Sequence, residues 1–107
     1  MTTISKDNKV VTLVNVFTVE PENQQKLVDL LAEATEKTIK NASGFVSVNI
    51  HKSLDGARVV NYAQWKSRED IEAMSKNPEA QAHMKLIMEI AKADFHLYEV
   101  ADTFELS

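Results

Sequence analysis

The spacing of the apolar residues changes several times along this chain, and the order of the changes restricts the folds it can adopt. Residues 10–20 form a β-rich apolar run, whereas residues 22–40 place apolar side chains at helical spacing. Two alternating segments follow at 45–53 and 57–66, separated by the hairpin-type turn Asp55-Gly56. Helical spacing returns over 67–76 and again from Pro78, and residues 95–104 have the pattern of a last strand.

Residues that start and stop helices support these boundaries. Pro21 suits a helix start, and Gly44 suits a stop just beyond a helix end. Ser67 is a plausible N-cap, and Asn77 is a second one before Pro78. The resulting order, β-α-β-β-α-β, predicts a ferredoxin-like α+β fold with an antiparallel four-stranded sheet and its helices on one face.

The composition predicts one globular domain over residues 9–107, with a flexible tail at residues 1–8. Hydrophobic residues make up 44% of the 107 residues, which is too many for a disordered chain. A net charge of −4 argues against nucleic acid or an anionic membrane as a partner. The polar N-terminus and the lack of a long apolar run predict a cytoplasmic protein.

Several chemistries lack the residues they need. Without cysteine the chain has no thiolate ligand for zinc or an iron–sulfur cluster. Its two glycines, Gly44 and Gly56, cannot form a glycine-rich phosphate loop. No His and carboxylate spacing indicates a metal site.

Apolar residues occupy both faces of the predicted first strand, with Leu13 and Phe17 on one side and Val14 and Val16 on the other. Helices can cover only one of these faces, so a second copy of the sheet is the simplest cover for the other. We therefore expect a homodimer, and the Val46/Val48/Ile50 side of the second strand is the predicted interface.

Polar side chains share strand faces with apolar ones, which predicts a ligand cavity between the sheet and the helices. Asn61 and Trp65 share one face of the third strand, because alternate side chains point the same way. Asn49 and His51 share a face of the second strand, and Asn15 lies on the Leu13/Phe17 side of the first. A simpler alternative makes Trp65 a core residue and leaves the polar groups near water at strand ends.

His83 and three methionines of the helical segments are the remaining candidates. His83 lies near the apolar stripe of the last helix, where a histidine can ligate haem iron but more often is half-exposed. Met74, Met84 and Met88 are expected to fill gaps in the core.

The element order, the Gly44-Phe45 entry into the second strand, His51, Asp55-Gly56 and the stretch from Val59 to Trp65 resemble the antibiotic biosynthesis monooxygenase (ABM) domain, over roughly residues 10–104. The nearest branch is that of the actinorhodin-type quinone-forming monooxygenases. The resemblance implies a dimeric α+β barrel and oxygenation without metal, flavin or haem. A tyrosine of the family falls at Ile71 in this chain, and an arginine of its last helix falls near Met84 or Lys85.

By this resemblance the chain is a cofactor-independent monooxygenase that oxidises a polyketide-like phenol or anthrone to a quinone with O₂. Asn61, Trp65 and His51 are the implied catalytic residues: the indole stacks on the substrate, the amide binds an oxygen that gains charge, and the imidazole accepts a proton. The predicted pocket also contains Asn49, Asn15, Phe17, Ile71 and His83.

Two alternatives stay open. A haem-degrading branch of the family uses an asparagine in the first strand and a histidine in the last helix, which Asn15 and His83 match. A non-catalytic dimer that binds small molecules is the second alternative, because fold does not fix function.

Overall fold

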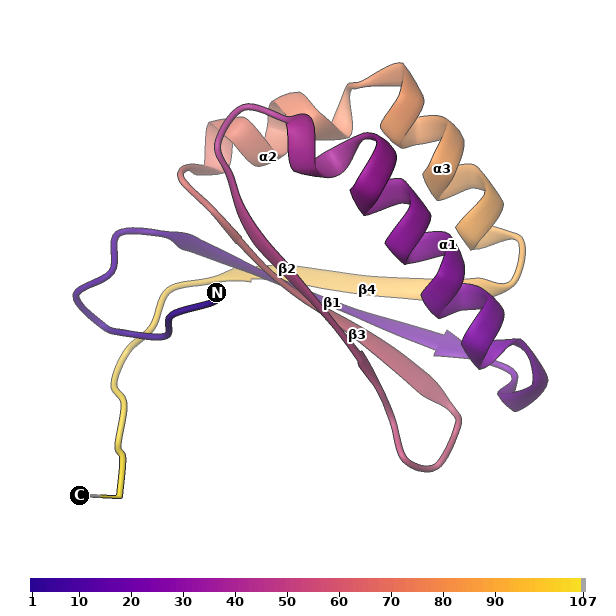
Figure 1. Cartoon of the computed structure of the whole chain (residues 1–107), viewed down its shortest axis with the longest axis horizontal. Coiled ribbons are helices and arrows are strands. Elements are labelled where there is room, and N and C mark those ends of the chain that lie inside the picture. The colour runs from indigo at the N-terminus through magenta and orange to yellow at the C-terminus, as the bar shows by residue number, and fades with distance from the viewer. Residues whose placement is uncertain (107) are drawn as a thin grey trace.

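A computed structural model describes residues 1–106 and confirms the predicted order of elements, with the second helical region divided in two (Figure 1). Short 3₁₀ turns flank the first helix at Pro21–Asn23 and Ile39–Asn41. The strands and helices are β1 (Val11–Val19), α1 (Gln24–Lys37), β2 (Phe45–Lys52), β3 (Arg58–Trp65), α2 (Arg68–Ser75), α3 (Pro78–Met88) and β4 (Ala91–Tyr98).

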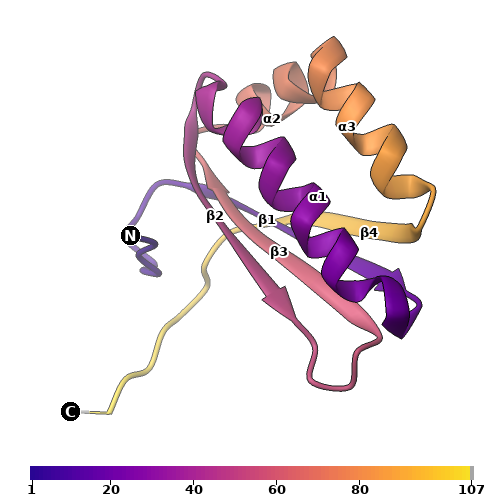
Figure 2. The same cartoon turned by 45° about the vertical axis from the view of Figure 1, so that its right-hand side comes forward.

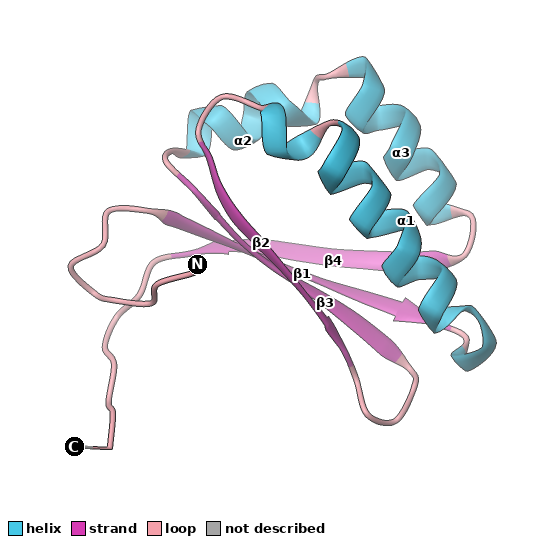
Figure 3. Ribbon diagram, in the orientation of Figure 1, coloured by secondary structure: helices cyan, strands magenta, loops and turns pink. Residues whose placement is uncertain are grey.

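The four strands form one antiparallel sheet in the order β2-β3-β1-β4. All three helices lie on one face of this sheet, and no helix of the described chain covers the other face (Figure 3). We call these the helix face and the open face. The ferredoxin-like α+β prediction is therefore confirmed.

The predicted caps are present where the sequence placed them. The Ser67 hydroxyl accepts from the Asp70 N–H and caps α2, while the Asn77 side chain caps α3 with Pro78 in its first turn. Gly44 adopts φ +82°, and a Cβ built there would lie 2.1 Å from Asp70 Oδ2. The entry into β2 therefore requires glycine.

The core lies between the helix face and the helices. Phe17, Val59, Leu27 and Ile87 are almost completely buried, and they join two sheet strands to α1 and α3. A second cluster at the other end of the sheet contains Trp65. The edge strand β4 lies beside these clusters and faces α2 and α3 across the helix face of the sheet.

The last strand differs from its prediction, since it covers Ala91–Tyr98 rather than residues 95–104. Ala91 pairs with Val19 and Tyr98 with Thr12, so β4 already runs along nearly all of β1 by Tyr98. The chain beyond Tyr98 leads away from the sheet (Figure 2).

The predicted faces of β2 are wrong. Val48 pairs with Ala63 and Ile50 with Asn61, which places both aliphatic side chains on the helix face. An irregularity between Phe45 and Ser47 shifts the alternation at the start of the strand. The Val46/Val48/Ile50 side therefore cannot be the dimer interface.

Asn49 and His51 consequently lie on the open face, where they pair with Tyr62 and Val60. The prediction that they lie under the helices is wrong, because the helices cover the aliphatic side of β2 instead. His51 is exposed.

The first residues of the predicted flexible tail contact the open face. The Thr2 hydroxyl donates to Ser47 Oγ (3.0 Å), and Gln64 Nε2 donates to the Thr3 carbonyl (2.7 Å). Thr12 and Gln64 are both buried on this face. Within residues 1–106, no helix is both long enough and apolar enough to span a bilayer.

Candidate functional site

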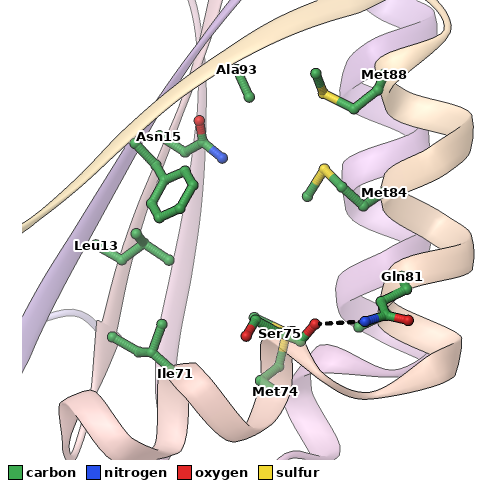
Figure 4. Close-up of a pocket in the computed structure, with 11 residues that line it drawn as sticks. Leu13, Asn15, Ile71, Met74, Ser75, Gln81, Met84, Met88 and Ala93 are labelled. Atoms are coloured by element: carbon green, nitrogen blue, oxygen red, sulfur yellow. Dashed lines mark hydrogen bonds between the residues drawn. The ribbon is translucent and has the colours of Figure 1, made fainter.

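A cavity of about 440 Å³ lies between the helix face of the sheet and the helices α2 and α3 (Figure 4). Pockets for small organic ligands typically measure about 300–1,000 Å³. Its walls come from β1, β4, α2 and α3, and consist of Leu13, Asn15, Ile71, Met74, Ser75, Ala80, Gln81, Met84, Met88, Ala93 and Phe95.

Most of this lining is apolar. Asn15, Ser75 and Gln81 supply its polar side chains, and no Asp, Glu, His, Lys, Arg or Tyr is among the described lining residues. Gln81 is tied to the neighbouring helix, because its Nε2 donates to the Ser75 carbonyl (3.2 Å). The cavity therefore suits a largely apolar ligand that carries a few neutral hydrogen-bonding groups.

Asn15 brings an amide into this apolar surface. The side chain is 8% exposed, and within residues 1–106 its Oδ1 has no hydrogen-bond partner. Figure 4 shows the amide nitrogen directed into the cavity. An unsatisfied buried acceptor costs about 1–3 kcal/mol, so a ligand that supplies the missing donor gains that stabilisation.

Asn61 lies directly opposite Asn15 in the β1–β3 pairing. Its Oδ1 is likewise buried without a partner among the described residues. Directly paired residues of neighbouring strands lie on the same face with Cβ atoms about 4.5–5.5 Å apart. The two amides thus form a polar pair on an otherwise apolar part of the helix face.

Trp65 packs against residues that line the cavity. The indole is 1% exposed and meets the Phe45 ring edge-on, with the ring centroids 5.7 Å apart. It belongs to the cluster that contains Ile71 and Met74, which do line the cavity. The Trp65 Nε1 has no partner within residues 1–106.

The structure brings together only part of the predicted site. Asn15 and Ile71 line the cavity, Asn61 is paired with Asn15, and Trp65 contacts the wall residues. Phe17 lies in the separate core cluster with α1 and is not part of the lining.

His83 does not line the cavity. Its Nε2 lies 3.2 Å from Thr38 Oγ1 at the end of α1, and that hydroxyl donates to Glu79 Oε2 (3.0 Å). Haem ligation would require the imidazole to face the ligand. The residues therefore do not fit the haem alternative, and among residues 1–106 no group of three His, Asp or Glu side chains could hold a metal ion.

The sequence interpretation missed the methionines as cavity residues. Met84 and Met88 are 38% and 45% exposed, so they form cavity wall and not core. Ala80, Met84 and Met88 recur at intervals of four residues, which places them on one side of α3. This spacing was the available signal, but it does not distinguish a core from a cavity.

The ionisable groups with shifted pKa values lie outside the cavity. A hydrogen bond from the Lys37 ammonium lowers the pKa of Glu33, and the bond from the Ala57 N–H lowers the pKa of Asp55. Both carboxylates are on the surface, so the electrostatics of the cavity depend on amide and hydroxyl dipoles.

Comparisons with known proteins show which family the chain is similar to. Residues 10–86 match the model of the family described as antibiotic biosynthesis monooxygenase. The tetracenomycin-F1 monooxygenase of Streptomyces glaucescens is 43% identical over 104 residues, which are 97% of this chain and 93% of that protein. The relative and the family both confirm the prediction of a monooxygenase, an oxidoreductase.

Solved structures show the same fold. The N63A mutant of SnoaB from Streptomyces nogalater, a cofactor-independent oxygenase, aligns with a TM-score of 0.79 and 20% identity over 90% of this chain and 97% of that one. An anthrone oxidase-like protein aligns with a TM-score of 0.84 and 29% identity, over 92% of this chain and 42% of the other. By sequence and by fold, this chain belongs to the antibiotic biosynthesis monooxygenase family.

Proposed function

We propose that this protein is a cofactor-independent monooxygenase that oxidises a polycyclic phenol or anthrone to a quinone with O₂. The main observation is an apolar cavity lined by Asn15, whose buried amide oxygen has no hydrogen-bond partner among residues 1–106, as is also true of its neighbour Asn61. The names of the tetracenomycin-F1 monooxygenase, the oxygenase SnoaB and the anthrone oxidase-like protein support the substrate class and the absence of a cofactor.

In this reaction the substrate supplies the electrons. Its anion donates one electron to O₂, the two radicals combine into a hydroperoxide, and loss of water leaves the new carbonyl group. One oxygen atom enters the product and the other leaves as water. The protein must bind and orient the substrate, stabilise its anion and exclude bulk solvent.

The amide pair would stabilise the anion. Asn15 presents its Nδ2 to the cavity, where it can donate to a substrate oxygen that gains charge. Its unpartnered Oδ1 can accept from a phenolic O–H. Asn61 stands beside it and would either share this contact or hold the Asn15 amide in place.

Trp65 would affect the substrate indirectly, through the residues that line the cavity. The sequence suggested that the indole stacks on the substrate, but Leu13, Ile71 and Met74 are the cavity residues that belong to its cluster. We therefore propose Trp65 as a positioning residue, which fixes the shape of the apolar wall that the flat ring system contacts.

The proton would not go to His51, which lies on the open face. Because no ionisable side chain is among the described lining residues, the acidity of the substrate itself should set the pH dependence. In a series of hydroxylated anthrones, the midpoint of the pH–rate profile should follow the pKa of each substrate. A constant midpoint near neutral pH would instead indicate a protein base.

The activity is tested by O₂ uptake with a hydroxylated anthrone and metal-free, haem-free protein. We expect quinone formation with one O₂ consumed per quinone, and no turnover under anaerobic conditions. Uptake no faster than the uncatalysed reaction across a panel of anthrones and hydroquinones would refute the proposed function. In that case the small-molecule-binding dimer becomes the better reading.

We also propose that the open face pairs with a second copy. Val14 and Val16 pair with Tyr62 and Val60, which forms a half-buried apolar centre on this face. A Val16→Asp variant should sediment as a monomer at micromolar concentration, whereas the unmodified protein should sediment as a dimer. Unmodified protein that sediments as a monomer would refute this pairing.

A further inference from the structure

Three of the four methionines line a single cavity. Met84 and Met88 extend from α3 toward the sheet, on the side opposite Asn15 and Ala93 (Figure 4). Met74 completes the group from α2. The fourth methionine, Met1, is fully exposed at the N-terminus.

A thioether is the side chain most easily oxidised in a chain without cysteine. In this step the sulfur attacks the outer oxygen of a hydroperoxide. An S–O bond forms and the O–O bond breaks, while the proton goes to the departing oxygen. The thioether and the hydroperoxide thus become a sulfoxide and an alcohol, and the sulfur is oxidised as the peroxide is reduced.

We propose that Met84 and Met88 are modification sites, at which an apolar organic hydroperoxide held in the cavity oxidises the thioethers and weakens the binding of apolar ligands. The inference rests on the proposed function only for the natural oxidant, the substrate hydroperoxide. The reactivity itself follows from the position of the two sulfur-bearing side chains in an apolar cavity.

Met84 and Met88 are better placed for this reaction than Met74. They are 38% and 45% exposed in the cavity wall, whereas Met74 is half-buried in the Trp65 cluster. The same cavity wall would concentrate an apolar hydroperoxide beside them. A polar peroxide gains no such advantage and should react according to exposure alone.

Oxidation should weaken binding because it puts a strong acceptor into an apolar wall. The donors of the cavity are few: Gln81 already uses its Nε2 on the Ser75 carbonyl, and a bound ligand would lie between the Asn15 amide and the α3 wall. A ligand would press the new S=O group against apolar surface without a donor. We expect about tenfold weaker binding of an apolar ligand, which is about 1.4 kcal/mol.

The test compares two oxidants on the whole protein without substrate. Limiting cumene hydroperoxide represents the apolar class and hydrogen peroxide the polar class. N-acetylmethionine amide in the same tube reports the reactivity of a free thioether, and peptide mapping locates each added oxygen. We expect cumene hydroperoxide to oxidise Met84 and Met88 before Met1 and the free standard, and hydrogen peroxide to reverse this order.

Binding of the fluorescent probe N-phenyl-1-naphthylamine is measured before and after cumene hydroperoxide. The affinity should fall about tenfold in the unmodified protein and in Met74→Leu, but should stay constant in the Met84→Leu/Met88→Leu double variant relative to its own untreated sample. Oxidation of Met1 first by both reagents, or sulfoxides without loss of affinity, would overturn the proposal. Because neither arm uses turnover, a failed O₂-uptake assay would refute the proposed function separately.

Discussion

Replacing Asn15 with leucine should make the protein more stable and nearly inactive. The side chain is 8% exposed, lies between Leu13 and Phe17 on the helix face, and carries an Oδ1 without a partner among residues 1–106. An unsatisfied buried acceptor costs about 1–3 kcal/mol, and leucine has a similar volume without that cost. We expect a net gain of about 1 kcal/mol, because the neighbouring Asn61 oxygen stays unsatisfied.

For a domain of this size, about 1 kcal/mol raises the melting temperature by about 4–8 °C. The turnover of an anthrone should fall about 10²–10³-fold, which is the usual loss when one donor to a developing oxyanion is removed. Calorimetry gives the first quantity and initial rates of O₂ uptake give the second.

Asn49→Leu is the matched control, because it removes an asparagine from the opposite face of the sheet. The Asn49 Nδ2 donates to the Tyr62 carbonyl (3.2 Å), so this variant loses a bond and should be destabilised by about 0.5–1.5 kcal/mol. The two variants should therefore shift stability in opposite directions. An Asn15→Leu protein that melts below the unmodified one, or turns over within a few-fold of it, would contradict the reasoning.

Three further variants test the scaffold. Gln24→Ala should lower the free energy of unfolding in urea by about 1–3 kcal/mol, because the buried Gln24 Nε2 donates to two main-chain carbonyls of the β2–β3 hairpin, each at 3.0 Å. Gly44→Ala should lower the free energy of unfolding in urea by about 1–2 kcal/mol or more, since φ is +82° and the new Cβ would collide with Asp70. An unchanged urea concentration at the midpoint of unfolding would contradict the positive φ. The folded-state pKa of Asp55 lies below its ordinary 3.8, so its contribution is complete above that pH and is lost as the pH falls through the folded-state pKa. Asp55→Asn should remove this part of the acid dependence, and equal slopes below pH 4 in both proteins would refute the assignment.

The element order was accessible from sequence because its signals are local. The shift from alternating to helical spacing and the caps at Ser67 and Asn77 each act within a few residues. The shared face of Val59, Asn61, Ala63 and Trp65 follows from the same short-range geometry. Apart from the bounds of the last strand, the structure therefore agrees with the sequence where the prediction needed only neighbouring residues.

The orientation of β2 was not accessible in this way. Alternation shows that Val48 and Ile50 share a side, but it does not tell which side the helices cover. Pairing with Ala63 and Asn61 decides that, and it moves Asn49 and His51 to the open face. Because the face of β2 was predicted wrongly, His51, the predicted base, does not lie at the site.

The cavity depended most on tertiary structure. Met84 and Met88 have the spacing of a core stripe, and only the distance between α3 and β4 makes them walls of a space instead. His83 lies one residue before Met84, yet its ring turns to Thr38 on α1. The sequence by itself determined the order of strands and helices, the residues that share a face within one strand, and the resemblance to the family. The packing of the helices on the sheet decided which side chains meet in the cavity. This packing brings together residues that are far apart in the chain, and no periodic pattern in the sequence records it.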